Sequence, residues 1–299
     1  MTTNLKSAPR PKLACEIAGD RVFAARRADR GGTLEAYSGR DLPMGSVVPD
    51  LIEANLRRRD DVSSSIREAL ASVGGRGRDV IAVLPDAAVR VVLVDFDALP
   101  ANKQEAEAVV RFRLKKSLPF DVDKAKVSYH AQTNGQGVRA IAAVALSSVI
   151  EDYEAAFRDA GYTPGVVLPS MLAALGAADS SRPTLVVKVD ARTIGIAILD
   201  NNQMLLFRTL ENTRGASISG EQLAEEVYPS IVFFQDTYSL NIEHIFVAGL
   251  PESSGAAPAL AGQTNAEVRE LITGAQLGSA TGTSAPRYRM AAVVGALIS

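Results

Sequence analysis

The sequence contains few of the residues that most enzymes use for catalysis or metal binding. Among its 299 residues there are one cysteine, two histidines and no tryptophan. The single cysteine, Cys15, excludes a disulfide framework and is typical of a reducing compartment. So few soft ligands also argue against a zinc site. We therefore predict no metal site and assign no catalytic residue.

The sequence also lacks an excess of charge of one sign. Lys and Arg number 32 against 34 Asp and Glu, so the net charge is −2. Nucleic-acid-binding proteins normally carry a basic excess, and we therefore expect no nucleic acid partner.

Long apolar runs are absent as well. The longest, 140–146 and 291–298, are far shorter than the roughly 20 residues that span a bilayer. Residues 1–11 lack the apolar core of a signal peptide and are typical of a disordered tail. We expect a cytosolic protein without direct membrane insertion, which reaches a membrane only through a partner.

The chain does contain one succession of elements that occurs twice. In the first half, periodicity predicts three strands, a helix and a strand, at 13–18, 21–27, 33–37, 50–73 and 79–84. In the second half it predicts the same succession, at 184–189, 194–199, 203–208, 219–240 and 244–248. Two such units predict two mixed sheets covered by helices, with a cleft between two lobes. This α/β order is typical of the two-lobed actin/Hsp70-like (ribonuclease H-like) fold.

Between the two halves, residues 86–165 predict a separate subdomain. They contain a β-α-β-β-α succession with a turn at Asn134-Gly135, and its elements lie at 88–96, 101–117, 126–132, 138–146 and 148–160. The predicted parts of the chain are therefore the tail 1–11, a first lobe of 12–85 plus 287–299, the inserted subdomain 86–165 and a second lobe 166–286.

The second half also contains less regular features. Pro229 lies inside the apolar stripe of the helix at 219–240, so we expect a kink or a break there. Residues 264–273 have helical character, and 278–285 are typical of a flexible surface loop. Residues 287–298 predict a short helix that packs on the first lobe.

The inserted subdomain resembles a known family. After the helix at 101–117 the chain reads Leu118-Pro119-Phe120-Asp121, and the next strand carries Tyr129. This succession resembles the PilM family, the actin-like cytoplasmic proteins of the type IV pilus assembly platform. Similarity to the same family extends over much of the remaining chain, at 140–172, 221–238, 245–249 and 290–297.

The resemblance implies a scaffold at the cytoplasmic face of the inner membrane. Members of the family bind the N-terminal peptide of a bitopic PilN-like membrane protein, and they can hold ATP and Mg between the lobes. Such a partner would bring a chain without a membrane span to the membrane. Other pilus platform or motor components are further implied partners. By the same resemblance, Leu118, Pro119 and Phe120 help form the peptide groove; the alternative is that Phe120 fills the core of the insert.

The nucleotide motifs depart from the pattern of actin-like folds. Such folds hold phosphates on two hairpins that carry Asp, Gly and small hydroxyl residues, because glycine lets the backbone N–H groups approach the phosphates. The first hairpin reads Glu16-Ile17-Ala18-Gly19-Asp20, so Glu replaces Asp and Gly19 comes one position late. An acidic Asp20 would repel phosphate unless a metal ion lay between them.

The other two motifs are also incomplete. The second hairpin keeps Asp190, Thr193 and Gly195 but lacks a glycine directly behind Asp190. The turn at 248–251, which resembles the adenosine-binding turn, keeps Gly249, and its proline removes a backbone donor. These departures favour a retained fold with weak or lost ATP binding, and ATP binding in an atypical cleft is the alternative. In that case the resemblance assigns the contacts to Gly19, Asp190, Thr193, Gly195 and Gly249.

The predicted function is a PilM-like scaffold of a type IV pilus assembly platform, peripheral at the inner membrane through a PilN-like partner. One alternative is an active actin-like ATPase or kinase that uses the cleft. A second is the cytoplasmic component of a type II secretion platform, although family members of that kind usually continue into a membrane helix.

Overall fold

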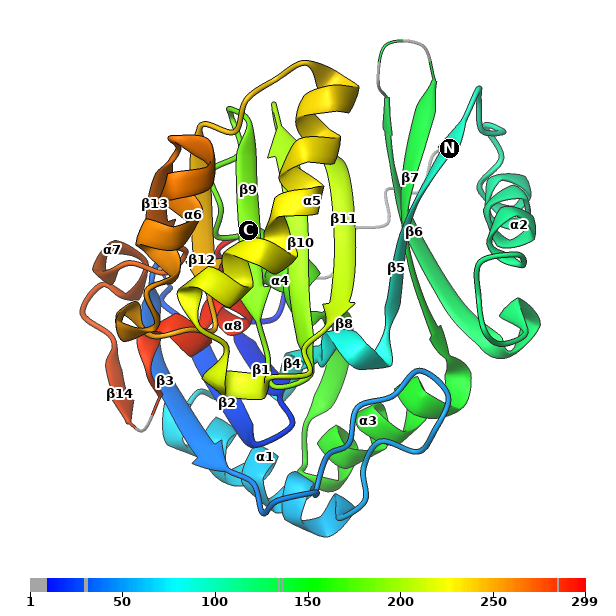
Figure 1. Ribbon diagram of the computed structural model, residues 1–299. Coiled ribbons are helices and arrows are strands. Elements are labelled where there is room, and N and C mark those ends of the chain that lie inside the picture. The colour runs from blue at the N-terminus through cyan, green and yellow to red at the C-terminus, as the bar shows by residue number, and fades with distance from the viewer. Residues whose placement is uncertain (1–9, 30–31, 134, 136, 284) are drawn as a thin grey trace.

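Two β-sheets form the framework of the protein, in a computed structural model that describes residues 10–29, 32–133, 135, 137–283 and 285–299 (Figure 1). Their strand orders correspond, apart from one extra edge strand in the first sheet. The first sheet has the order β14-β3-β2-β1-β4-β8. Its strands are β1 (Leu13–Ile17), β2 (Arg21–Arg27), β3 (Leu34–Asp41), β4 (Asp79–Leu84), β8 (Thr163–Pro169) and β14 (Thr281–Thr283). The second sheet has the order β11-β10-β9-β12-β13. Its strands are β9 (Thr184–Val189), β10 (Thr193–Asp200), β11 (Gln203–Glu211), β12 (His244–Ala248) and β13 (Glu267–Glu270).

Both sheets combine an antiparallel meander with two parallel strands. In the first, β1 and β3 pair antiparallel with β2, while β4 pairs parallel with β1 and with β8. In the second, β9 and β11 pair antiparallel with β10, while β12 pairs parallel with β9 and with β13. The predicted repeat of three strands, a helix and a strand is therefore confirmed as a repeat of topology.

Helices cover the sheets in layers. One face of the first sheet carries α1 (Arg59–Val73) and α3 (Ser147–Asp159). The far face of the second sheet carries α5 (Gly220–Tyr238) and α6 (Ala256–Thr264). Between the two sheets lie α4 (Ser170–Leu175) and α8 (Ala291–Ile298), in one apolar core to which both sheets contribute. The lobes are thus joined by a shared core, and the closing helix packs on the first sheet as predicted.

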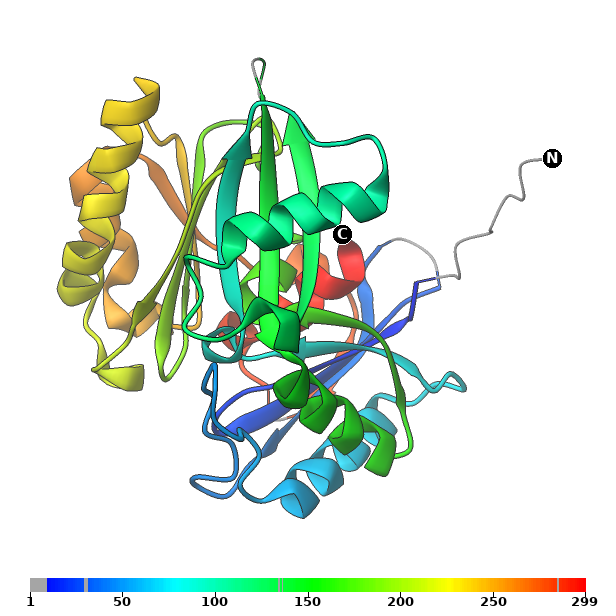
Figure 2. The same ribbon diagram turned by 90° about the vertical axis from the view of Figure 1, so that its right-hand side faces the viewer.

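The inserted part has a sheet and core of its own. Its three strands have the order β5-β7-β6 and are β5 (Arg90–Phe96), β6 (Ala125–Thr133) and β7 (Val138–Leu146). The helix α2 (Lys103–Leu114) packs against one face of this sheet through Val110 and Leu114, and it forms the outermost layer in Figure 2. Short elements complete the fold: η1 (Asp86–Ala88), η2 (Val122–Lys124), η3 (Gly215–Ser217), η4 (Glu252–Ser254), α7 (Gly274–Leu277) and η5 (Arg287–Arg289).

The boundary of the insert differs from the one expected at 165. The helix α3, assigned to the insert from its sequence, packs in the core of the first sheet because its apolar stripe, including Tyr153 and Phe157, faces α1 and that sheet. The strand β8, which spans the expected boundary, pairs with β4 in the first sheet. The insert itself therefore comprises β5, α2, β6 and β7.

Smaller features of the fold can be compared with the predicted elements. The helix α1 begins at Arg59 instead of 50, because Asp50 folds a turn by accepting the N–H groups of Ile52 and Glu53. Of the two outcomes expected at Pro229, a kink or a break, the break does not occur, because α5 continues through it. Pro229 lies exposed, where water can satisfy the carbonyl that loses its donor.

The other differences concern the segment after α6. This helix ends at Asn265, whose φ of 58° is left-handed, so the chain forms β13 where the sequence predicted a helix. The predicted loop at 278–285 contributes β14, which pairs parallel with β3. Residues 1–9 of the predicted tail and Asn134 of the predicted turn lie outside the described residues.

Candidate functional site

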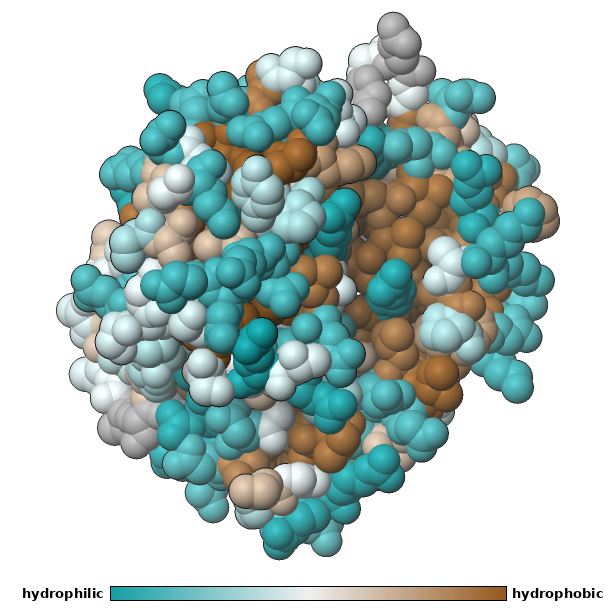
Figure 3. All heavy atoms as spheres, in the orientation of Figure 1, coloured by the Kyte–Doolittle hydropathy of each residue, from teal (hydrophilic) through white to brown (hydrophobic). Residues whose placement is uncertain are grey.

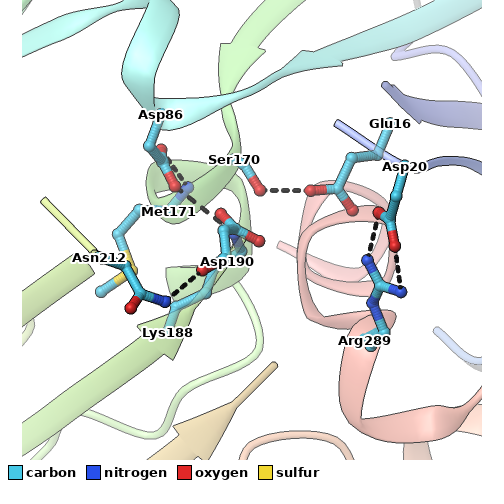
Figure 4. Close-up of polar contacts among 9 residues, drawn as sticks. All are labelled: Glu16, Asp20, Asp86, Ser170, Met171, Lys188, Asp190, Asn212 and Arg289. Carbon is cyan, nitrogen blue, oxygen red and sulfur yellow. Dashed lines mark hydrogen bonds and ion pairs between the residues drawn. The ribbon is translucent and has the colours of Figure 1, made fainter. Parts of the chain in front are cut away.

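Two strand-to-strand hairpins face each other between the lobes (Figure 4). The turn between β1 and β2 is closed by the Ala18 N–H, which donates to the carbonyl of Arg21 at 2.8 Å. The turn between β9 and β10 is closed in the same way, from the Asp190 N–H to the carbonyl of Thr193 at 2.8 Å. Both backbone donors are thus used inside the hairpins. The cavity between the turns measures about 30 Å³, which is enough for a water molecule or two but not for a larger ligand.

The structure brings together some of the residues that the sequence singled out. Gly19, Asp190 and Thr193 line the small cavity. Gly249 lines an adjoining cavity of about 10 Å³, next to Lys188 and Arg289. Gly195 lines neither cavity, because it lies within β10 against Met171, where an added Cβ would come within 3.0 Å of the Met171 sulfur.

Gly249 has a structural reason to be glycine. Its φ is +89°, and an added Cβ would lie 1.8 Å from the carbonyl oxygen of Val189. No other residue type fits such an approach between the end of β12 and the end of β9.

A buried ion network crosses from one lobe to the other beside these turns. Lys188 lies on β9 of the second lobe, and its Nζ is 3.5 Å from Oδ2 of Asp86, which follows β4 in the first lobe. The same ammonium group contacts Asp190. The side chains of Lys188 and Asp86 are 5% and 3% exposed. Glu16, on β1, accepts a hydrogen bond from the Ser170 hydroxyl, and Asp86 accepts the Met171 N–H at 2.7 Å.

Burial and the shared lysine set the protonation of this network. Burial raises the pKa of Glu16 to about 7, and Lys188 opposes the rise. Burial also raises the pKa of Asp86 to about 6, again against the attraction of Lys188. For Lys188, burial alone would lower the pKa, but the carboxylates of Asp190, Asp86 and Glu16 together raise it above the ordinary value. Lys188 is therefore charged, and it balances carboxylates of both lobes.

A second ion pair lies in the lining of the small cavity. Arg289, just before α8, donates to both carboxylate oxygens of Asp20, at 2.6 and 2.9 Å. Partial burial acts to raise the pKa of Asp20, but the Arg289 hydrogen bonds hold it below its usual value. The guanidinium also lies 5.4 Å from the centre of the Phe23 ring.

Sequence reasoning missed Lys188, Asp86, Ser170 and Arg289, because their partners lie far away in the chain. One signal was present: Lys188 is the one charged residue of β9, a strand in which every residue is buried. A charge at such a position requires a partner, and that partner lies 102 residues away.

No family model and no curated protein matches the chain. Among solved structures, the chain superposes on the PilM-PilN type IV pilus biogenesis complex with a TM-score of 0.78, at 18% identity over 97% of this chain and 98% of that chain. A protein of unknown function with an actin-like ATPase fold from Bacteroides thetaiotaomicron has a TM-score of 0.52, at 8% identity over 86% and 89%. The cytoplasmic domain of EpsL, an inner membrane component of the type II secretion system of Vibrio cholerae, also has 0.52, at 10% identity over 96% and 92%.

The chain has an actin-like fold. The two-lobed α/β fold predicted from the sequence is confirmed, and the resemblance to PilM is confirmed at the level of the fold.

An actin-like ATPase fold implies a magnesium nucleotide between the lobes, and the residues present do not fit one. Each carboxylate there already has a partner, in Lys188, Ser170, the Met171 N–H or Arg289. Within the described part of the chain, no three His, Cys, Asp or Glu side chains form a group that could hold a metal ion. The cavity of about 30 Å³ between the hairpins is lined by four carboxylates, which would repel phosphate oxygens, and by Arg192 and Arg289.

A larger cavity of about 320 Å³ lies in the second lobe beyond the Gly249 turn. It shares no lining residue with the two small cavities, and its lining includes Leu250, Pro251, Val268 and Ile272. Its size falls at the lower limit for small-molecule pockets. The arginines at this cavity are already paired, Arg269 with Glu267 and Arg287 with Glu270.

A groove of about 180 Å³ lies where the insert meets the first lobe. It is bordered by β6, at one edge of the three-stranded sheet, and by β8, at one edge of the first sheet. Its lining is mostly apolar and comprises Val89, Lys126, Val127, Ser128, Ala143, Ala145, Ile150, Glu154, Val167, Leu168 and Pro169. The groove therefore combines two strand edges with an apolar floor.

The Leu118-Pro119-Phe120 corner lies outside the lining of this groove. Leu118 and Phe120 are half-buried and pack against the core of the insert, while Pro119 is exposed. The corner precedes η2 and β6, so its packing helps to fix where the β6 edge begins.

Apolar side chains are also visible on the surface of the molecule. Figure 3 shows them in a hollow beside the inserted sheet, next to β11. Of the helices in the described residues, none has both the length and the apolar character needed to cross a bilayer.

Proposed function

We propose that this protein is a PilM-like scaffold of a type IV pilus assembly platform, which captures an extended segment of a PilN-like bitopic membrane protein. The observation that carries the proposal is the groove between β6 and β8, with its two strand edges and apolar lining. The similarity in fold to a PilM that was solved with PilN adds support, since it covers nearly the full length of both chains.

The physical basis of capture is β-strand addition. An edge strand offers a row of N–H and C=O groups without a partner strand, and an extended peptide can pair with them while alternate side chains enter a groove. A volume of about 180 Å³ suits one or two apolar side chains rather than a folded domain. Lys126 and Glu154 line the groove, and the Nζ and Oε1 atoms lie 3.8 Å apart. Each would pair with a peptide group of the opposite charge.

The Leu118-Pro119-Phe120 corner would support this role by positioning the β6 edge. Its two apolar side chains pack against the core of the insert, so a change there would move the edge that pairs with the peptide. Direct contact between the corner and the partner is part of the same proposal.

Weak or lost ATP binding is the second part of the proposal. It is supported by the paired carboxylates, the Asp20–Arg289 ion pair and the small volume between the hairpins. If a nucleotide were held, Gly19, Asp190, Thr193, Gly195 and Gly249 would be its contacts. The larger cavity beyond Gly249 is the one observation that favours the alternative of a nucleotide-using enzyme.

The partner would place the protein at the cytoplasmic face of the inner membrane, where other platform or motor components could join it. A component of a type II secretion platform is the competing assignment, and the similarity in fold to cytoplasmic EpsL supports it. The superposition on PilM is closer, with a TM-score of 0.78 against 0.52.

Co-purification tests the proposal. The protein is co-expressed with the PilN-like protein of the same genome, once intact and once without its cytosolic N-terminal segment. We expect recovery of the intact partner only. Equal recovery of both forms, or of neither, would contradict capture through that segment.

A further inference from the structure

Lys188 occupies a position in β9 where the strand otherwise buries apolar side chains. Leu185, Val187 and Val189 face the core beneath α5, while Val186 points toward the core between the sheets. Because side chains alternate along a strand, Lys188 points to the same side as Val186, toward the first lobe. There its ammonium group lies 3.5 Å from Asp86.

The groups around this ammonium come from both lobes. Glu16 on β1 and Asp86 in η1 belong to the first lobe, and Asp190 belongs to the second. Tyr288 and Arg289 line the same small cavity as Lys188, and Arg289 is paired with Asp20. Within the described residues, Lys188 is thus the cation that contacts a carboxylate of each lobe at this junction.

We propose that Lys188 is a built-in cation that joins the two lobes, in the place where an actin-like ATPase would use a bound magnesium nucleotide. The lobes of this protein are then held together without any ligand. The proposal concerns the cleft alone and does not depend on the pilus-related function or on peptide capture.

The arrangement around Lys188 is what such a tether requires. Removal of one partner from a buried ion pair leaves an uncompensated charge, so the pair resists separation once formed. The other contacts of the carboxylates hold them in place: Ser170 donates to Glu16, and the Met171 N–H donates to Asp86. Protonation of Glu16, whose pKa is about 7, limits the excess of negative charge.

Substitution of Lys188 and Asp86, followed by measurement of amide hydrogen exchange, tests the proposal. We would compare Lys188→Met, Asp86→Asn and the double variant with the wild type, and measure amide exchange in the hairpins at 16–20 and 188–194. Lys115→Met is the matched control, because this lysine is 53% exposed and its Nζ lies 3.5 Å from a carboxylate oxygen of Asp123.

We expect Lys188→Met to speed exchange in both hairpins by at least about tenfold and to lower the melting temperature by roughly 10 °C. Adding Asp86→Asn removes the carboxylate that Lys188→Met leaves unpaired, so part of the protection should return. The double variant should still exchange faster than the wild type, because the ionic link between the lobes is gone. Lys115→Met should behave like the wild type, and millimolar Mg-ATP should leave wild-type exchange unchanged.

Three results would overturn the proposal: wild-type exchange in Lys188→Met, wild-type exchange in the double variant, or slower wild-type exchange in Mg-ATP. If Lys188→Met does not fold, the double variant decides. A folded double variant whose hairpins exchange faster than those of the wild type supports the tether. A double variant that exchanges like the wild type, or that does not fold, overturns it.

Discussion

Arg289 donates two hydrogen bonds to the carboxylate of Asp20, at 2.6 and 2.9 Å, although 269 positions separate the two residues in the chain. This bidentate pair links the first hairpin to the segment that enters α8. The Arg289 guanidinium and the Asp20 carboxylate both line the cavity between the two hairpins. With the Lys188 network behind it, the pair leaves each carboxylate of the cleft with a partner inside the protein.

The Asp20–Arg289 pair should contribute modestly to stability. Its geometry is bidentate, which favours a real contribution, but the Asp20 side chain is 56% exposed, which reduces it. We expect a coupling of about 0.5–1 kcal/mol in a double-mutant cycle of Asp20→Asn and Arg289→Gln, measured by urea unfolding. Additive effects of the two substitutions would show that the pair contributes nothing.

Mg-ATP should not stabilise the protein. A ligand that binds only the folded state raises stability by RT ln(1 + [L]/Kd), so millimolar ATP would be visible in a melting curve even at a Kd near 100 μM. We expect no shift with 5 mM Mg-ATP in differential scanning fluorimetry. Adenosine without phosphates is the informative control, because the cavity beyond Gly249 is separate from the hairpins. A shift with ATP that adenosine does not reproduce would restore the nucleotide-binding alternative.

Stability should fall as the pH rises from about 5 to 7. Glu16 has a folded-state pKa of about 7, above the ordinary 4.5, so the folded protein binds more protons than the unfolded chain between these values. Asp86, with a folded-state pKa of about 6, acts in the same direction. Carboxyls whose pKa is lowered, such as Asp20, lose their stabilising charge only at lower pH and do not oppose this trend.

The Glu16→Gln variant isolates this effect, since glutamine can still accept the Ser170 hydrogen bond. Between pH 5 and pH 8, the unfolding free energy of the wild type should fall by on the order of 2 kcal/mol more than that of Glu16→Gln. Denaturant unfolding at several pH values measures this difference. Parallel curves for the two proteins would mean that Glu16 does not titrate in the buried network.

Gly249 should tolerate no side chain, for reasons of packing. In Gly249→Ala the new Cβ would meet the Val189 carbonyl oxygen at 1.8 Å, so we expect a loss of about 3 kcal/mol or more. Gly255→Ala is the matched control, with a φ of +74° and no atom within 4 Å of the new Cβ; it should lose only about 1 kcal/mol. Chemical denaturation compares them, and equal losses would show that the φ angle, not the contact, requires glycine.

Much of the fold could be predicted from the sequence, because strands and helices leave local periodic signals. The runs at 21–27, 79–84 and 184–189 formed strands with the predicted bounds. The assignment of α3 to the insert failed for a different reason: the apolar stripe with Tyr153 predicts a buried helix but does not say which sheet buries it.

The site was less predictable, because its contacts join distant parts of the chain. Asp190 and Thr193 could be placed at the cleft from the hairpin pattern. The pairing of Lys188 with Asp86 depends on how the two sheets stack, and no local pattern encodes that. The groove between β6 and β8 likewise exists only once the insert is docked on the first lobe.

Titration calorimetry tests the central claim most directly. A synthetic peptide with the N-terminal sequence of the PilN-like protein is titrated into the wild type, Ser128→Trp and Ala108→Trp. Ser128 is an exposed residue in the lining of the groove, and Ala108 is an exposed residue of α2 outside it. We predict saturable binding to the wild type and to Ala108→Trp, with at least about tenfold weaker binding to Ser128→Trp, which corresponds to about 1.4 kcal/mol. Unchanged affinity in Ser128→Trp, or no binding to the wild type, would contradict the account.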